Sequence, residues 1–490
     1  TNLYIIIMSL LQQKILELKG VKARGVKDIS HAQSKDYDDI FRSSLDYVEG
    51  LKEYHQEIIT VILPNSIEYL EVLIACILTG NIFNPIPFFT SDHELVRIFK
   101  YIDSKVVITT RKLINKKYDS QEIYSPESFR VVKNNIPYTK NFVNGNKIAA
   151  LYYSSGTTGN PKGVLYSHDN IFYLIESINK GFGFDGSTKH LSILPFGHTA
   201  SINYNIFPCL FNKSNLVIAE GFSSVAHRFF KILSEEEINY TQLVPTIVYM
   251  LLKVRYDTSE MSFNSLEFIG CGSSILPVES QIKFERQYGI RIGNLYGLSE
   301  TGPSHIDDPR LLDWKPGSIG IPLDVNICKL SKNSELLIKG RNIFSGYYKN
   351  IELYNKVVKD GWFYTGDLVS CYKGQYTYKD RKKDLIIKSG INIVPGEVEE
   401  ILYMNKYIHE AAVVGVPHEV HGEEVIAIVT LKDSYDNKDE VKTQLYQLLT
   451  KFISSYKHPI DILFFESLPK THSGKIMRRE LRRVVKHEYN

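Results

Sequence analysis

Short β-branched runs alternate with longer apolar stretches in the first half of the chain. Residues 57–63 (EIITVIL) form a continuous apolar run that is typical of a buried strand. Residues 66–78 (SIEYLEVLIACIL) place apolar side chains at helical spacing, and residues 105–109 (KVVIT) return to the strand pattern. Similar strand-like runs follow at 216–219 and 240–244. This alternation predicts βαβ units and a mostly parallel sheet.

The pattern changes after about residue 316. Short runs separated by turns at 334–340, 361–367 and 374–380 predict a small antiparallel β subdomain. The last stretch of roughly a hundred residues has strands of its own (AAVVGV, EVIAIVTL, DILFFE) and is long enough for a separate α+β domain. We therefore predict an α/β fold with a large N-terminal domain at 1–380, containing mostly parallel βαβ subdomains plus the small β subdomain. A hinge at 381–384 and a smaller α+β C-terminal domain at 385–490 follow.

Composition and charge exclude several classes of protein. The chain has 490 residues, of which 43% are hydrophobic, so it can bury a core and is not disordered. Its 58 Lys and Arg against 55 Asp and Glu give a net charge of only +3, which argues against a nucleic-acid partner. Basic residues gather near the C-terminus, where either a solvated helix face or an anionic ligand would explain them. They are Lys475, Arg478, Arg479, Arg482, Arg483 and Lys486.

The cysteines and the N-terminal apolar run bear on the compartment. The five cysteines are isolated and never at CxxC spacing, which predicts free thiols in a reducing compartment and neither a disulfide framework nor a zinc site. The run Leu3–Leu11 is shorter than the roughly 20 residues that span a bilayer, and it lacks the features of a signal peptide. It is either a core element or translated upstream sequence with Met8 as the natural start. We expect a cytoplasmic protein with no integral membrane segment.

The densest chemical signal is the segment Ser154–Gly163 (SSGTTGNPKG), which follows the strand-like run KIAALYY. Glycines let backbone N–H groups approach a phosphate, the hydroxyls add donors, and Lys162 adds a positive charge. A Walker A loop is excluded, because Pro161 precedes the lysine where glycine belongs and Gly163 follows it where Ser or Thr should bind magnesium. The segment therefore predicts a phosphate-binding loop of another kind.

Four further motifs follow this loop in the same chain. They are NLYGLSETG at 294–302, GWFYTGD at 361–367, DRKKD at 380–384 and PKTHSGK at 469–475. Together with the loop, in this order, they resemble the signatures of the adenylate-forming superfamily, which contains acyl- and aryl-CoA synthetases, free-standing adenylation domains and beetle luciferases. The resemblance covers the chain from about residue 150 to 480.

The resemblance implies a nucleotide site. A tyrosine on a Gly-flanked turn offers a flat face to a base, and in the family the tyrosine matching Tyr296 stacks on adenine. Glu300 is a hard oxygen ligand that is expected to position Mg²⁺, and Thr301 is expected to contact the α-phosphate. Asp367 is an acceptor suited to the two ribose hydroxyls, with Arg381 assisting. The remaining ATP- or AMP-binding residues by resemblance are Ser154, Ser155, Gly156, Thr157, Thr158, Gly159, Lys162, Ser273, Ser274 and Asn294.

The resemblance also implies a two-step reaction. A carboxylate and MgATP first give an acyl-adenylate and pyrophosphate, and the cation of Lys475 would stabilise the charge that develops at the α-phosphate. A thiol then attacks the acyl group and AMP leaves. Family members swing the C-terminal domain between the steps, so this domain is expected to be mobile about Lys383 and to bring Ser389 and Gly390 to CoA. One departure is that Ile387 stands where some relatives carry a second catalytic lysine.

The acyl acid itself is the least determined part. The segment Pro195–His198 matches the family's acyl-pocket segment, and Gly297 belongs to the same pocket. His198 is expected to contact the substrate carboxylate or to gate the thiol tunnel. The expected function is an ATP-dependent ligase that uses ATP, Mg²⁺ and CoA on a small aryl or acyl acid. The alternatives are an adenylation enzyme that loads a separate carrier protein, and an inactive nucleotide-binding regulator.

Overall fold

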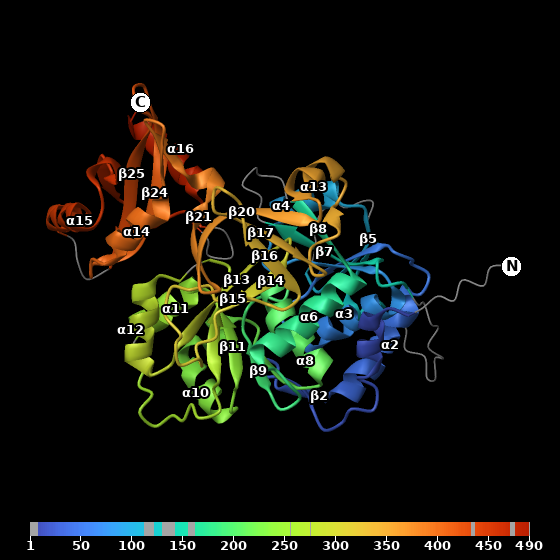
Figure 1. The fold of residues 1–490 in the computed structure, drawn as a ribbon. Helices are drawn as coiled ribbons and strands as arrows, with labels where there is room; N and C mark the ends of the chain where they lie inside the picture. The colour runs from blue at the N-terminus through green and yellow to red at the C-terminus, as the bar shows by residue number, and fades with distance from the viewer. Residues whose placement is uncertain are drawn as a thin grey trace.

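The computed structural model describes residues 8–111, 122–129, 143–154, 162–254, 256–274, 276–432, 437–470 and 476–489. Four β-sheets organise these residues (Figure 1). The first three sheets and their helices are called the large domain below. The fourth sheet, with its helices, is called the terminal domain, and in Figure 1 it is the orange and red part that lies above α11 and α12.

The first sheet is mostly parallel and carries one end of the site described below. Its central strands from β13 to β1 pair in parallel, and β2, β14 and β15 add antiparallel edges. The strands in spatial order are β15 (Ile321–Pro322), β14 (Gly302–Ile306), β13 (Ile292–Leu298), β12 (Phe268–Cys271), β11 (Tyr240–Leu243), β9 (Lys189–Ser192), β10 (Asn215–Ile218), β1 (Gly25–Asp28) and β2 (Gln33–Asp36).

The second sheet is parallel in its centre and ends in the hairpin β7–β8, whose tip is the phosphate-loop segment. Its strands in spatial order are β18 (Gly346–Tyr347), β8 (Lys162–Ser167), β7 (Ile148–Ser154), β4 (Ile82–Pro85), β3 (Ile58–Ile62), β5 (Ser104–Thr109) and β6 (Glu122–Tyr124).

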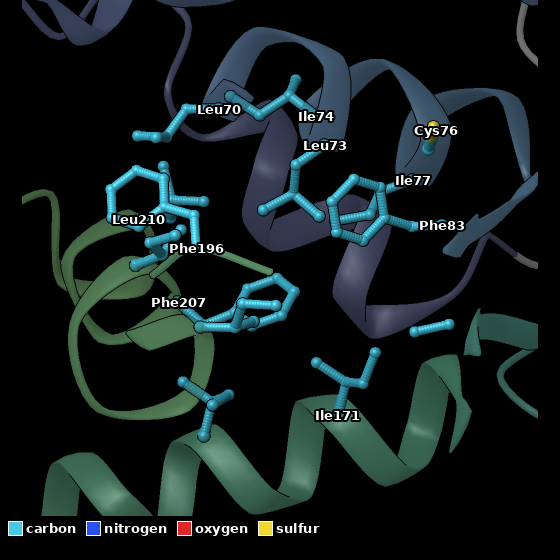
Figure 2. Packing of buried hydrophobic residues seen from close by; sticks show 14 of the residues in the cluster. Leu70, Leu73, Ile74, Cys76, Ile77, Phe83, Ile171, Phe196, Phe207 and Leu210 are labelled. Atoms are coloured by element: carbon cyan, nitrogen blue, oxygen red, sulfur yellow. The ribbon is translucent and has the colours of Figure 1, made fainter. Parts of the chain in front are cut away.

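A large apolar core fills the space between these two sheets. Figure 2 shows part of it, where Leu73 and Ile77 of α3 face Phe83 and Phe207, with Ile171 of α6 below them. The helices of this core are α1 (Leu10–Leu16), α2 (Tyr37–Leu51), α3 (Ile67–Thr79), α6 (His168–Phe182), α7 (Thr199–Ser201) and α8 (Phe207–Asn212), with a π-helical turn η1 (Ile202–Ile206) between the last two.

Helices also cover the outer faces of the two sheets. The outer face of the first sheet packs in a second core on α10 (Phe229–Glu235), α11 (Pro245–Val254) and α12 (Val278–Tyr288), and that of the second sheet packs on α4 (Asp92–Tyr101). The layered arrangement explains why the strands read as continuous apolar runs, since both of their faces are buried. Short helical pieces complete this region: α5 (Pro126–Phe129), α9 (Phe222–Val225) and η2 (Ala226–Arg228).

The third sheet is small and antiparallel. Its strands are β16 (Asn326–Leu330), β17 (Glu335–Gly340), β20 (Trp362–Tyr372), β19 (Val358–Lys359) and β21 (Gln375–Arg381), and α13 (Ile351–Val357) precedes β19. It leads through η3 (Lys382–Asp384) into the terminal domain.

The terminal domain packs helices on both faces of the fourth sheet. The strands are β23 (Ile391–Ile393), β22 (Ile386–Lys388), β25 (Gly422–Leu431), β24 (Ile408–His418) and β26 (Asp461–Phe464). The helices are α14 (Pro395–Tyr403), α15 (Lys438–Phe452), η4 (Ser455–Lys457) and α16 (Arg478–Tyr489). It contacts the large domain through the rings of Tyr249 of α11 and His409 of β24, whose centroids are 6.0 Å apart.

The predicted fold class is confirmed, with parallel sheets first, a small antiparallel sheet next and an α+β unit last. The residue bounds that we gave to the domains and hinge stay a prediction. The apolar N-terminal run lies partly in residues 1–7, outside the described part of the chain, and α1 begins at Leu10. Among the helices described, none has both the length and the apolar character needed to cross a membrane.

Candidate functional site

A cavity of about 250 Å³ lies between the large domain and the terminal domain. The large domain contributes residues after β12 and at the end of β13, and the third sheet contributes the middle of β20 and the end of β21. The terminal domain contributes α14, β24 and the start of α16. Six residues expected at the nucleotide or acyl site line this one cavity: Ser273, Ser274, Tyr296, Gly297, Asp367 and Arg381.

Asp367 is a buried carboxylate held from two sides at the cavity wall. The Tyr296 hydroxyl donates to its Oδ2 at 2.6 Å, and Arg381 Nε lies 2.9 Å from its Oδ1. The antiparallel pairing of β20 with β21 sets Asp367 opposite Arg381, so the sheet register creates the ion pair. Burial raises the pKa of Tyr296, and the neighbouring Asp367 carboxylate raises it further. Tyr296 therefore stays a neutral donor beside an ionised acceptor.

Positive charge collects close to this carboxylate. Partial desolvation lowers the pKa of Lys383, and the proximity of Arg381 and Lys162 lowers it further, while Asp384 and Asp367 act in the opposite direction. Lys162 begins β8 and pairs in register with Ser154 of β7, so these two residues flank the phosphate-loop segment. Of these cations Arg381 lines the cavity itself, and a cation at a cavity wall attracts an anion. This arrangement fits the phosphates of a nucleotide.

Two segments that carry predicted site residues lie outside the described residues, although the residues on either side of them are described. Ser155, Gly156, Thr157, Thr158 and Gly159 lie outside the described residues, as does Lys475, and the side chain of Ser154 is not described either.

The segment that carries Lys475 is nevertheless anchored at both ends. A bridge pairs Lys470 with Ile476, and Ile476 lines the cavity. The residue that follows Lys475 therefore lies at the cavity wall.

Glu300 and Thr301 lie on the turn between β13 and β14. Glu300 is half-buried, and the Tyr347 hydroxyl donates to its Oε1 at 2.7 Å. Burial raises the pKa of Tyr347, and Glu300 adds to that rise. Thr301 is fully buried, and its hydroxyl donates to the Gly302 carbonyl at 2.7 Å. Neither residue lines the cavity in this conformation, so their contacts with magnesium and the α-phosphate stay predictions. Glu300 does fit a magnesium ligand, since it is a half-buried carboxylate and carboxylate oxygens are ligands that Mg²⁺ prefers.

The segment after β12 is shaped by a buried amide. Ser273 adopts a left-handed backbone with φ of 70°, which is uncommon for a residue with a Cβ. Asn294 is buried, and its Oδ1 accepts from the Leu276 backbone N–H at 3.3 Å. Through this hydrogen bond Asn294 stabilises the segment that carries Ser273 and Ser274 at the cavity wall. Its contact with the nucleotide stays a prediction.

His198 caps the short helix α7 and is half-buried. Its Nδ1 accepts from the Ala200 backbone N–H at 3.2 Å, and burial lowers the pKa of the ring. A neutral imidazole that accepts at Nδ1 carries its proton on Nε2. His198 can therefore offer one neutral N–H donor to a substrate, in agreement with either role predicted for it.

The predicted CoA-binding turn lies away from the cavity. Ser389 and Gly390 form the exposed turn between β22 and β23 with φ of 49° and 78°. The Ser389 hydroxyl and His421 Nδ1 are 2.8 Å apart. Lys388 beside them pairs with Glu424 at 2.7 Å, so it does not replace the lysine that is missing at Ile387.

Sequence reasoning missed an ion-pair network that ties the terminal domain to the hinge segment. Both Nη2 contacts of Arg478 with the Glu399 carboxylate are 2.7 Å, and Nη1 lies 3.3 Å from Asp380 Oδ1. Arg482 donates to the Asp384 carbonyl at 3.3 Å. The solvated-face interpretation is therefore wrong for these two arginines, because acids from distant segments pair with them. Their spacing of four on one helix face was the available signal.

Comparison with known proteins gives the family. Residues 24–348 match the family described as AMP-binding enzyme, and residues 397–475 match the family described as AMP-binding enzyme C-terminal domain.

Individual relatives are CoA ligases by name. A long-chain-fatty-acid–CoA ligase of Bacillus subtilis is 35% identical over 357 residues, which cover 68% of this chain and 61% of that protein. The chain thus spans less than two thirds of that relative. A sulfoacetate–CoA ligase of Cupriavidus necator is 27% identical over 458 residues, 86% of each protein. Among solved structures, ATP-bound MatB from Rhodopseudomonas palustris superposes with a TM-score of 0.90 at 21% identity, covering 99% of this chain and 100% of that one, which shows a shared fold.

Proposed function

We propose that this chain, which belongs to the AMP-binding enzyme family, is an ATP-dependent acid–CoA ligase. The observation that carries the proposal is the Asp367 carboxylate, held by Tyr296 and Arg381 at an interdomain cavity beside a group of cations. An acceptor, an aromatic face and compensating positive charge in one place are what a nucleotide needs. We also propose a cytoplasmic location, because all five cysteines are unpaired thiols.

The adenosine would be bound by the residues that line the cavity. Asp367 is an acceptor-only group, so both of its oxygens can take hydrogen bonds from the vicinal ribose hydroxyls. Arg381 pairs with that carboxylate and orients it. The ring of Tyr296 offers a π-surface to the adenine, while Ser273 and Ser274 supply polar groups at the cavity edge.

The phosphates would lie toward Lys162 and the hairpin tip. Lys383 is repelled by both Arg381 and Lys162, so a polyphosphate that enters would relieve that repulsion. Bound Mg²⁺ supplies Lewis-acid neutralisation of the triphosphate charge, and Glu300 is the residue that would hold it. Lys475 would place its ammonium at the α-phosphate, where negative charge grows in the transition state.

The reaction then proceeds in two displacements. A carboxylate oxygen of the acid attacks the α-phosphorus, the bond to the pyrophosphate oxygen breaks, and an acyl-adenylate forms. The CoA thiol, losing its proton, attacks the acyl carbon, and AMP leaves with the bonding pair. The neutral Nε2–H of His198 suits a contact with the substrate carboxylate in the first step. We propose that the acid is a small aryl or acyl acid.

Pyrophosphate release tests this function. Purified enzyme with ATP and Mg²⁺ is assayed against a panel of aryl, short acyl, long acyl and amino acids, each with and without CoA. We expect release with one class of acid and, with CoA, formation of AMP and a thioester in equal amounts. Release that CoA does not change would indicate a carrier protein as the acceptor, and failure to bind ATP would contradict the proposal.

Lys475→Ala separates the two steps. We expect at least about a hundredfold slower adenylate formation, because a cation at the developing charge is removed. Capture of a pre-made adenylate by CoA should stay within about threefold of wild type, since that step does not need this cation. Lys486→Ala, an exposed lysine on α16, is the matched control and should change neither step. Equal losses in both steps would contradict the role of Lys475.

A further inference from the structure

Directly behind the wall of the cavity lies a group of buried polar side chains, which we call the polar layer. Its members are His190 and Ser192 of β9, Tyr240 and Gln242 of β11, and Asn205 of η1. Each is no more than 1% exposed. The π-helical turn η1 packs on β9 and β11, so the polar layer fills the interface between that turn and the first sheet.

Strand register places the polar layer next to the cavity. Tyr240 lies opposite His190 on one side and Phe268 on the other, and Gln242 lies opposite Gly270. Side chains two residues apart share one face of a sheet, so Gln242 is one step nearer to the carboxyl ends of the strands. Those ends lead into the segment at Ser273 that lines the cavity.

Two glycines leave the space that Gln242 occupies. A Cβ on Gly270 would lie 2.5 Å from Gln242 Oε1 and 2.7 Å from the Tyr240 hydroxyl. A Cβ on Gly272, the residue before Ser273, would lie 3.1 Å from Gln242 Nε2. The amide of Gln242 therefore packs over the two glycines immediately behind the cavity wall.

The hydrogen bonds of the polar layer are incomplete. The Tyr240 hydroxyl donates to Gln242 Oε1 at 2.6 Å, and Gln242 Nε2 donates to the Leu243 carbonyl at 3.1 Å. Within the described residues, neither ring nitrogen of His190 completes a hydrogen bond, nor does Ser192 Oγ or Asn205 Oδ1.

The buried ring of His190 is neutral. Burial lowers the pKa of His190 to about 3, and the Tyr204 backbone offsets part of that effect. A neutral imidazole offers one donor and one acceptor. Buried polar groups seldom stay unpaired, so this layer calls for polar partners beyond those that the described residues supply.

We propose that the polar layer selects the acyl group, so that the enzyme takes short acids carrying a hydrogen-bonding group at their far end, with Gln242 as the stop for longer chains. The inference rests on the proposed function. An acyl chain that extends past Gly272 meets the Gln242 amide, and an alkyl chain could advance only by separating it from Tyr240. Both groups would then be buried without partners, whereas a terminal hydroxyl or carbonyl would satisfy them.

The test measures affinity and does not depend on turnover. The probes are 5′-O-(N-acylsulfamoyl)adenosines, stable mimics of an acyl-adenylate, with 4-hydroxybutanoyl, butanoyl and decanoyl groups, and sulfamoyladenosine without an acyl group as reference. Isothermal titration gives each Kd. For wild type we expect 4-hydroxybutanoyl to bind about tenfold tighter than butanoyl, and decanoyl to bind no tighter than the reference.

Two substitutions at Gln242 separate length from polarity. Gln242→Ala removes the amide that packs over the glycines, so it should tighten the binding of the decanoyl probe about tenfold or more. Gln242→Leu keeps the volume, so it should abolish the advantage of the hydroxyl without admitting decanoyl. Thr241→Val is the control on the same strand, because Thr241 is buried on the opposite face and donates to the Leu191 carbonyl. Each variant must bind sulfamoyladenosine within about twofold of wild type, which shows that its site is folded.

The outcomes are distinguishable. An unchanged order of affinities in Gln242→Ala, or a wild type that binds decanoyl most tightly, overturns the role of the polar layer while the ligase function stands. Sulfamoyladenosine that fails to bind wild type contradicts the proposed function itself, and the inference falls with it. A shifted order in Thr241→Val as large as that in Gln242→Ala would also overturn the proposal.

Discussion

Replacing Arg478 with methionine should loosen the terminal domain from the segment that joins it to the large domain. The guanidinium makes two contacts of 2.7 Å with Glu399 on α14 and one of 3.3 Å with Asp380 at the end of β21. Methionine keeps most of the apolar stem and removes the charge. Asp380 is only 1% exposed, so its carboxylate would lose its cation while remaining buried.

The size of the effect follows from burial. Removing one partner of a buried ion pair costs about 3–5 kcal/mol. The Arg478 side chain is 23% exposed, and Asp380 keeps hydrogen bonds from the backbone N–H groups of Gly396 and Arg381. Water and these donors compensate part of the loss, so we expect about 2–3 kcal/mol. The loss of stability in Arg478→Lys should be smaller than that in Arg478→Met but greater than zero. Lysine keeps the charge but cannot form the bidentate contact with Glu399.

The two tryptophans make the assay specific to a domain. The chain has two, Trp314 and Trp362, and both lie in the large domain. Urea unfolding followed by tryptophan fluorescence therefore reports the large domain, whereas far-ultraviolet circular dichroism reports the whole chain. In Arg478→Met we expect the dichroism transition to begin at lower urea than the fluorescence transition.

A matched arginine on the same helix provides the control. Arg483 is 72% exposed and pairs only with Glu480 among the ion pairs described, at 3.1 Å, so Arg483→Met should cost less than about 0.5 kcal/mol. Equal effects of the two substitutions, or coincident transitions in Arg478→Met, would refute the reasoning that the buried network anchors the terminal domain.

Three further results are expected. Tyr296→Phe keeps the ring but removes a hydrogen bond of 2.6 Å to a buried carboxylate, so urea unfolding should show a loss of about 1.5–3 kcal/mol, and a loss below about 0.5 kcal/mol would contradict the importance of that bond. Burial raises the pKa of Asp307 from 3.8 to about 7. The folded protein then holds a proton that the unfolded chain releases, so this contribution to stability is complete below about pH 4 and is lost as the pH rises to about 7. The decline amounts to at most about 1.4 kcal/mol per pH unit, and Asp307→Asn should flatten it in urea titrations between pH 4 and 8. Parallel curves of stability against pH for the two proteins would exclude a contribution from Asp307. Cys371 is the one cysteine classed as exposed, so iodoacetamide at pH 8 should label one thiol in the native protein and five in denaturant, and rapid native labelling of Cys76 would be inconsistent with its burial.

Elements that depend on local pattern could be predicted closely from the sequence. The helix expected at 66–78 is α3, Ile67–Thr79, because its apolar face is complete and because Ser66 caps its start and Gly80 its end. The strand expected at 361–367 is β20, Trp362–Tyr372, and its extra length comes from pairing with β21, which ends at the contact of Tyr372 with Gln375. Pairing partners lie outside the local pattern, so the end of that strand could not be read from it.

The site divides in the same way. Motifs identified Asp367 and Arg381, and the sheet register then brought them together. The partners of Arg478 are 79 and 98 positions away, so charge spacing alone could not assign them. The polar layer was missed for a related reason: Gln242 and His190 sit in strand-like runs, where a single polar residue gives no sign of which others share its face.

The cavity with walls from two domains has a consequence for the timing of the reaction. A ligand in contact with both walls loses part of its contacts when the domains separate, so its dissociation is coupled to that motion. Measured affinity is likewise reduced by the fraction of time that the walls are apart. Arg478 lines this cavity from the start of α16, so Arg478→Met, which removes its contacts with Glu399 and Asp380, should shorten the residence time of a bound adenylate.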